Sequence, residues 1–145
     1  DQKPEMSAAG IADAACQNIA TKKYDFILIN FANADLVGHS ANIPAIIKGI
    51  ETIDQCLSRI GRTAFQNGYP LIVTSDHGNA EEKRTPQGEK IPSHSTNPVP
   101  FILASPDPDF QPIKLHDGEL IDVAPTMLKL MNQKIPREMT GRPLY

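Results

Sequence analysis

The sequence predicts an α/β fold with a mostly parallel sheet. Segments with helical periodicity alternate along the chain with short apolar runs, which is the pattern of helices packed on a sheet. The apolar runs are nearly continuous, as expected of strands that are buried on both faces. The length of 145 residues suits one domain with a hydrophobic core.

The first half of the chain predicts two helices and one strand. Residues 5–20 carry apolar side chains at three- and four-residue spacing, and Ser7 could cap the resulting helix. Residues 25–31, with the sequence DFILINF, are expected to form a strand buried on both faces. Residues 43–65 repeat the helical pattern, and Pro44 is tolerated in its first turn.

The second half predicts two further strands around a polar loop. The pair Asn67-Gly68 should end the preceding helix and lead into an apolar strand at residues 71–73. Residues 82–98 are polar and rich in proline, so we expect a loop with a function. Residues 99–104 are a third strand candidate, which Pro100 demotes toward a sheet edge or the start of a strand.

A last helix is predicted after Asp122, which could cap it, with Pro125 in the first turn. The two cysteines, Cys16 and Cys56, fall in helical patterns. They are expected to be small buried thiols rather than a disulfide or a metal pair, which favours a cytoplasmic location.

Composition argues against several classes of partner. Hydrophobic residues make up 40% and charged residues 21% of the chain, as in a folded protein. The net charge is −3 and no basic stripe is visible, so we expect no nucleic-acid partner. We also expect no membrane partner, because no apolar run approaches the roughly 20 residues that span a bilayer. The first residue is Asp1 rather than Met, which indicates a processed chain or a piece of a longer one.

The run TSDHGNAE, residues 74–81, is the most informative motif. Asp76 and His77 stand where the strand at 71–73 must end, and Gly78 lets the backbone turn there. Ligands of open α/β sheets bind at this end of the strands, so the pair indicates a metal site. Adjacent residues converge on one ion only if the backbone turns between them; otherwise they serve two neighbouring ions. The alternative is a polar turn in which Asp76 caps the next helix.

Two further clusters add candidate ligands. Asp35 and His39 would point to one side of a helical turn and could share a cation, although Gly38 also permits a tighter loop. The alternative is a capping Asp35 beside an exposed His39. His94 lies in the polar loop, where nothing local explains a histidine, and it gains weight from the other two clusters.

The candidate set therefore holds two aspartates and three histidines. Without thiolates, a closed zinc site of the cysteine type is not expected, and mixed oxygen and nitrogen ligands favour Mn²⁺, Zn²⁺ or Fe²⁺ over Ca²⁺. Five ligands are too many for one open catalytic ion and too few for two well-held ions. The count predicts a two-metal site with ligands missing, and two ions about 3.5–4 Å apart are the usual clamp for phosphoryl transfer.

Several motifs, in the same order along the chain, closely resemble the cofactor-independent (2,3-bisphosphoglycerate-independent) phosphoglycerate mutase family. These motifs are PEMSA (4–8), NFANADLVGHS (30–40), TSDHGNAE (74–81), HSTNPVPF (94–101), DVAPTML (122–128) and EMTGRPL (138–144). TSDHGN alone would indicate only the wider alkaline phosphatase superfamily, and HSTNPVP makes the resemblance specific.

The resemblance implies part of an alkaline-phosphatase-like three-layer sandwich. It implies a cytoplasmic, monomeric parent enzyme of glycolysis, an isomerase that interconverts 3-phosphoglycerate and 2-phosphoglycerate through a phosphoserine. Two Mn²⁺ ions, or Mg²⁺ and other divalent ions in some members, activate that serine. Matched motif by motif, Asp35, His39 and His94 would hold one ion, while Asp76 and His77 would supply part of the shell of the second.

The family's serine nucleophile, an aspartate ligand of the second ion and an inserted transferase domain have no counterpart in residues 1–145. We therefore expect this chain to be the carboxyl-terminal portion of the metal-binding phosphatase domain, with no catalytic residue of its own and no activity alone. The alternatives are another metal-dependent phosphohydrolase or phosphomutase of the superfamily, or a non-catalytic binding fragment. Lacking a strand, the fragment should expose an edge or apolar face, and so either dimerise or depend on the missing segment.

Overall fold

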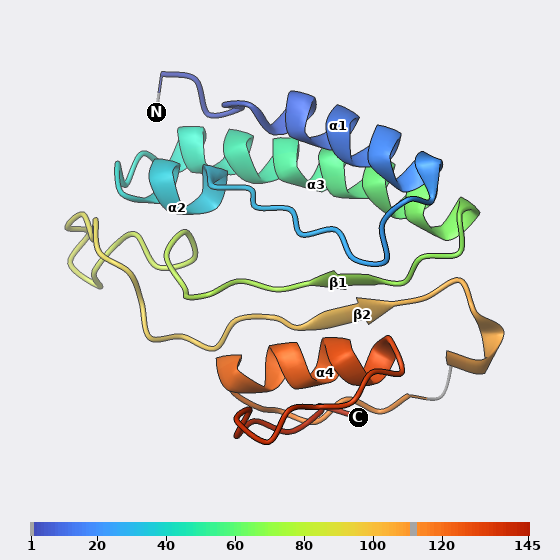
Figure 1. Ribbon diagram of the computed structural model, residues 1–145. Coiled ribbons are helices and arrows are strands. Elements are labelled where there is room, and N and C mark those ends of the chain that lie inside the picture. Colours follow the sequence, from blue (N-terminus) through green and yellow to red (C-terminus); the bar gives the residue numbers. More distant parts are fainter. Residues whose placement is uncertain (1, 111–112) are drawn as a thin grey trace. The chain divides into compact units, whose positions relative to one another are not determined.

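Helices supply most of the regular structure of the chain (Figure 1). The computed structural model describes residues 2–110 and 113–145, which divide into two units, Asp1–Asp107 and Pro108–Tyr145. The first unit contains α1 (Ala8–Thr21), α2 (Asn33–Gly38), α3 (Ile43–Gln66), β1 (Leu71–Val73) and β2 (Ile102–Ala104). The second contains two 3₁₀ turns, η1 (Pro108–Phe110) and η2 (Leu120–Asp122), and α4 (Val123–Leu130). Within the described residues, no helix is both long and apolar enough to cross a membrane.

The core of the first unit lies between α1 and α3, which run side by side in Figure 1. Small side chains of α1 recur at spacings of three and four and let the two helices approach closely. The buried core residues are Ala8, Ala12, Ala15, Ile19, Cys56, Ile60 and Ala64. Both predicted helices are confirmed, and Pro44 lies in the first turn of α3. Ser7 occupies the N-cap position of α1, but its side chain makes no capping hydrogen bond, so that part of the prediction is wrong.

Replacing Ile60 with alanine should lower the free energy of unfolding by about 2–5 kcal/mol, because Ile60 is only 1% exposed in this core. The matched control is Ile50→Ala on the same helix, where the side chain is 42% exposed and the expected loss is below about 1 kcal/mol. Urea unfolding of both variants measures the difference. Equal losses would show that the core of the first unit lies elsewhere.

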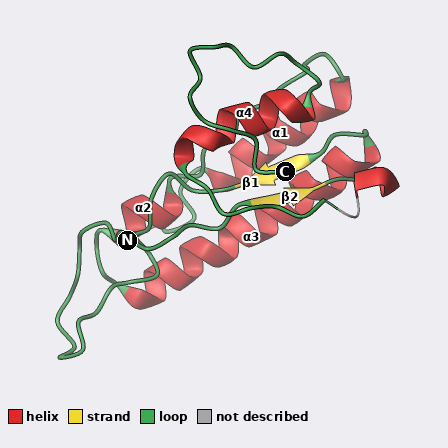
Figure 2. Ribbon diagram, turned by 90° about the horizontal axis from the view of Figure 1, so that it is seen from below, coloured by secondary structure: helices red, strands yellow, loops and turns green. Residues whose placement is uncertain are grey.

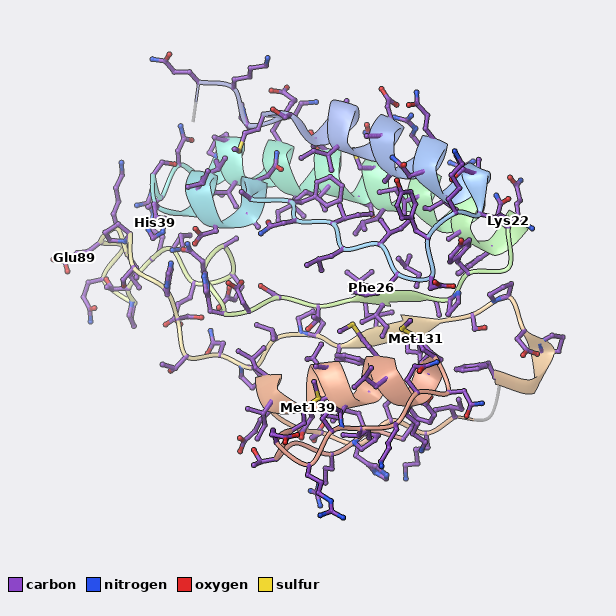
Figure 3. All side chains as sticks on the ribbon, in the orientation of Figure 1. Lys22, Phe26, His39, Glu89, Met131 and Met139 are labelled. Carbon is purple, nitrogen blue, oxygen red and sulfur yellow. The ribbon has the colours of Figure 1, made fainter. Side chains whose placement is uncertain are left out.

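The predicted strand at residues 25–31 is wrong in two respects. The segment is extended, but no backbone group in it pairs with a strand within the described residues. It also buries only one face, since Ile27, Ile29 and Phe31 pack on the α1–α3 core while Phe26 and Leu28 are 48% and 82% exposed. Figure 3 labels Phe26 on the side of the segment that faces β1. The run is therefore an extended, unpaired segment with an exposed apolar face.

The strands β1 and β2 pair with each other and run antiparallel (Figures 1 and 2). Leu71 lies opposite Ala104 and Val73 opposite Ile102. The strand predicted at residues 71–73 is confirmed. Of the strand predicted at residues 99–104, only Ile102–Ala104 forms β2, and Pro100, which lacks a backbone amide, lies outside it. The mostly parallel sheet is not confirmed, because these are the two strands that the described residues contain. The observed fold class is therefore α/β, meaning helices combined with strands, and the two described strands run antiparallel.

The second unit is organised around the buried carboxylate of Asp122. Its oxygens accept the backbone amides of Glu119 at 2.9 Å and Arg142 at 2.8 Å. These two hydrogen bonds lower the pKa of Asp122 below its usual range. Asp122 precedes α4 as predicted, yet its side chain caps η2 in a reciprocal capping box with Glu119 instead of capping α4.

Both cysteines are free thiols, and both lie in helices of the first unit. Cys56 is buried in the α1–α3 core, as expected. Cys16 is partly exposed at the edge of that core, where the hydroxyl of Thr63 donates to its sulfur at 3.5 Å.

Candidate metal centre

Helix α2 presents Asp35 and His39 on the same side, one turn apart. The helix is anchored by the buried side chain of Asn33, whose amide donates to the backbone carbonyls of Pro4 at 2.7 Å and Glu5 at 3.0 Å. Val37 packs on α3 from the opposite side of the turn. The helical alternative for Asp35 and His39 is thus the observed one, and their side chains approach to 3.3 Å.

Asp76 and His77 follow β1 in a backbone bend. The bend brings the two side chains to the same side, with His77 Nε2 lying 3.6 Å from Asp76 Oδ2. In a straight strand they would have pointed to opposite faces. His77 also lies 3.9 Å from Asp35 Oδ1, so this pair neighbours the ligands of α2.

His94 reaches the same place through a bridge between two loops. Ser95 donates its backbone amide to the carbonyl of Gly78 at 2.9 Å, which fixes the His94 loop beside His77. A Cβ at position 78 would clash with Ser95 Oγ and the Glu81 carboxylate, so this close approach requires glycine. The His94 ring then stacks on His77, with ring centroids 3.8 Å apart and an interplanar angle of 18°.

Three ligand atoms from two segments converge on one point. Asp35 Oδ1 lies 3.0 Å from His94 Nε2 and 3.3 Å from His39 Nε2, and the two imidazole nitrogens are 3.2 Å apart. The side chains of Asp35, His39 and His94 are 36%, 44% and 46% exposed, so one side of the cluster is open to solvent. Figure 3 labels His39 and Glu89 at the same end of the first unit, and Glu89 belongs to the polar loop at residues 82–98.

This spacing fits a divalent transition metal. Metal–ligand bonds of about 2.1 Å give ligand–ligand separations of about 3.0–3.4 Å in octahedral and tetrahedral shells. All three separations fall in that range. Among the described residues, Asp35, His39 and His94 form the group of acidic and imidazole side chains that could hold an ion. The open side leaves room for further ligands, as catalytic sites need.

The orientation of His39 suits this role. His39 Nδ1 lies 2.7 Å from the carbonyl oxygen of Pro92, which can only accept a hydrogen bond. Nδ1 must therefore carry the proton, and in the neutral ring Nε2 offers its lone pair toward Asp35 and His94. Such a hydrogen bond from the remote nitrogen is the usual way in which a metal-binding imidazole is oriented.

Asp35 is held as a carboxylate. Burial disfavours its charge, but the hydrogen bond from Asn79 Nδ2 at 2.7 Å and the nearby imidazoles together lower the pKa of Asp35 below 3.8. The same amide group donates to the backbone carbonyl of Asp35 at 3.1 Å. Asp35 is therefore charged at neutral pH and has a fixed orientation.

Glu81 ties the two loops of the centre together. One of its oxygens accepts the Ser95 hydroxyl and the Asn97 amide, and the other accepts the backbone amide of Asn79 at 2.8 Å. These hydrogen bonds, that from Ser95 first, lower the pKa of Glu81 to about 2. A carboxylate with a lowered pKa stabilises the folded state above its unfolded pKa, near 4.5, and this stabilisation is lost as pH falls toward 2.

The Glu81→Gln variant should therefore lose about 1 kcal/mol of stability at pH 7, a modest value because the side chain is exposed and screened. It should also lose less stability than the wild-type chain between pH 4.5 and pH 2. The control is Glu82→Gln, whose carboxylate accepts a hydrogen bond from Asn97 alone among the described residues. Urea unfolding as a function of pH distinguishes the two, and identical profiles would contradict this role of Glu81.

All five residues proposed from the sequence meet in this region, while the fourth histidine, His116, belongs to the second unit. Sequence reasoning missed the polar side chains that support them, notably Asn79, Glu81 and Lys83. Asn79 and Glu81 lie within the TSDHGNAE motif, and this position beside Asp76 and His77 is the sequence feature that could have identified them as supporting residues.

Curated relatives match nearly the whole chain. It is 46% identical over 144 residues to the 2,3-bisphosphoglycerate-independent phosphoglycerate mutase of Moorella thermoacetica, covering 99% of this chain and 27% of that protein. It is 47% identical over 148 residues to the protein of the same name from Thermomicrobium roseum, again covering 99% of this chain and 28% of the relative. The chain thus spans less than a third of the length of these relatives.

A solved structure of a phosphoglycerate mutase also matches nearly the whole chain. Leishmania mexicana phosphoglycerate mutase, crystallised at low cobalt concentration, matches with a TM-score of 0.85 and 27% identity over 99% of this chain and 29% of that one. The model of a family described as the Metalloenzyme superfamily matches residues 1–135. The chain therefore belongs to the Metalloenzyme superfamily.

Proposed function

We propose that this chain is the metal-binding, carboxyl-terminal portion of the phosphatase domain of a 2,3-bisphosphoglycerate-independent phosphoglycerate mutase. The complete enzyme interconverts 3-phosphoglycerate and 2-phosphoglycerate through a phosphoserine. The observation that carries the proposal is the convergence of Asp35, His39 and His94 within 3.0–3.3 Å of one another, in a chain whose relatives bear that enzyme's name.

Asp35, His39 and His94 would hold the first ion, and Asp76 and His77 would supply part of the shell of a second. Divalent ions bound there, Mn²⁺ in our proposal, would supply charge neutralisation for a phosphoryl group and activation of the attacking oxygen. Asp35 supplies a fixed negative charge, because Asn79 and the imidazoles keep it ionised. His39 and His94 supply imidazole nitrogens on the open side of the cluster, where a phosphate group can approach.

A chimera tests this function in a complete enzyme. In the Moorella thermoacetica mutase, the matching segment is replaced by these 145 residues, which align over 144 positions. We expect the chimera to convert 3-phosphoglycerate to 2-phosphoglycerate without added 2,3-bisphosphoglycerate, within about tenfold of the parent, since a tenfold change corresponds to only about 1.4 kcal/mol of barrier. Formation of 2-phosphoglycerate is followed by coupling to enolase.

Two variants of the chimera make the result decisive. His94→Ala should abolish turnover, whereas His116→Ala, outside the proposed ligand set, should retain it. A chimera that folds, as circular dichroism would show, and binds Mn²⁺ but does not isomerise would contradict the mutase assignment. It would favour another phosphohydrolase or phosphomutase of the alkaline phosphatase superfamily, which hydrolysis of phosphate esters would reveal.

The proposal also covers the cellular location, partners and oligomeric state of the parent enzyme. The parent is a monomeric cytoplasmic enzyme of glycolysis, without nucleic-acid or membrane partners. The isolated chain has an unpaired apolar segment at residues 25–31, with Leu28 82% exposed. It therefore either dimerises or depends on the rest of the parent for stability. Sedimentation at several concentrations separates these two outcomes.

A further inference from the structure

Lys83 is a buried cation that the proposed chemistry does not use. Its side chain is 3% exposed, although lysine is almost never fully buried unless it is paired. Its ammonium donates to Asn79 Oδ1 and to the backbone carbonyl of Ser93 at 2.9 Å. Both acceptors are neutral, so ordinary salt-bridge pairing does not account for the burial.

The two acceptors lie next to different ligands of the metal centre. Asn79 donates through its other amide atom to Asp35 Oδ1 at 2.7 Å, and Ser93 directly precedes His94. One ammonium group thus connects the carboxylate of α2 with the loop that carries His94. Without the donor from Lys83, the buried oxygen of Asn79 would lose its partner and the amide would lose its fixed orientation.

We propose that Lys83 is a positioning residue of the metal centre, which orients Asp35 through Asn79 and fixes the His94 loop through Ser93. This role rests on the proposed function, because it assigns ligands to that centre. Burial lowers the pKa of Lys83, while Glu81, Asp35 and Glu82 favour its charged form. An apolar side chain of similar length would avoid the cost of burying an ammonium group, so the hydrogen bonds account for its presence.

The sign of the effect of Lys83→Met on metal affinity separates positioning from simple electrostatics. Removing a positive charge near the site should by itself strengthen the binding of a divalent cation. Loss of positioning should weaken it, and residues that orient metal ligands typically contribute about 10- to 100-fold in affinity. We therefore expect Lys83→Met to raise the dissociation constant for Mn²⁺ about 10- to 100-fold, despite the favourable change in charge.

The experiment measures Mn²⁺ affinity of the 145-residue chain by titration calorimetry for Lys83→Met, Asn79→Ala and the double variant. If Lys83 acts mainly through Asn79, the double variant should bind about as weakly as the single ones. Lys90→Met, which removes an exposed lysine of the same loop, should stay within about twofold, as a surface substitution does. Unchanged or tighter binding by Lys83→Met, or fully additive losses, would overturn the proposal.

A metal-free measurement separates this inference from the proposed function. Hydrogen exchange of the Asn79 side-chain amide, followed by NMR, should be slow in the wild-type chain and faster in Lys83→Met, because the buried amide loses its restraint. The wild-type chain could bind no Mn²⁺ while the exchange is still faster in Lys83→Met. That outcome would support the positioning of Asp35 by Lys83 and contradict the proposed metal centre. If neither responds, or if Lys83→Met does not fold while Asn79→Ala folds and binds Mn²⁺ as tightly as the wild-type chain, the role of Lys83 is refuted.

Discussion

Replacing His39 with alanine is expected to lower the affinity of the chain for Mn²⁺ by at least about 100-fold, the upper range seen when only a supporting residue of a metal site is lost. His39 is one of three side chains whose ligand atoms lie within 3.3 Å of one another, and the other two cannot enclose an ion. The ring is also oriented in advance by Pro92, so its loss removes a ligand that needs little reorganisation. Titration calorimetry at neutral pH measures the change.

The control for His39→Ala is His116→Ala, which removes a histidine of the second unit and should leave the affinity unchanged. The titration should also give about one Mn²⁺ per wild-type chain. Asp76 and His77 would supply only part of a second shell, and Asp76 is 81% exposed, so we expect that the second position does not fill tightly. Two tight sites, or equal effects of the two substitutions, would contradict this arrangement of ligands.

The sequence predicts most of the candidate ligands because their side-chain directions depend on local structure. The i, i+4 spacing of Asp35 and His39 predicts a shared face as soon as one helical turn forms, and α2 is that turn. The Asp76-His77 pair needed only a bend after β1. Gly78 is required for the close approach of Ser95 and Glu81, and its φ is not in the left-handed region that the predicted turn would use. Local rules therefore predict the Asp35-His39 and Asp76-His77 pairs, whereas His94 was a candidate only because of these two clusters.

The hydrogen bonds that support the candidate ligands could not be predicted from such local rules. The hydrogen bonds from Lys83 to Ser93 and from Asn79 to Asp35 join residues 10 and 44 positions apart. Nothing in their local pattern distinguishes a buried lysine from an exposed one. Such polar networks become visible only when the fold brings their members together.

The strand predicted at residues 25–31 fails for a related reason. Apolar periodicity reports which side chains a segment can bury, and Ile27, Ile29 and Phe31 are indeed packed on the helices. A strand also needs a neighbour for its backbone, and within the described residues this segment has none. The exposed Phe26 and Leu28 form the face that a covering layer on a complete sheet would bury.

The 145-residue polypeptide alone is expected to show no isomerisation of 3-phosphoglycerate, even with saturating Mn²⁺. Phosphoryl transfer through a phosphoserine needs a serine hydroxyl that a base or a metal can activate. Three of the four serines near the centre use their hydroxyls elsewhere: Ser40 donates to Val37 O at 2.7 Å, Ser75 to His77 O at 2.8 Å, and Ser95 to Glu81. Ser93 is exposed and contributes its backbone carbonyl to Lys83.

The enolase-coupled assay checks this expectation, with the chimeric mutase as the positive control. A rate above the blank that scales with the polypeptide and disappears in His39→Ala would contradict it, since one of these serines would then have to act as the nucleophile. Replacing each serine with alanine would identify which one. The expected loss is complete, because without a serine nucleophile the covalent step cannot occur, whereas loss of a supporting residue only misplaces groups that remain.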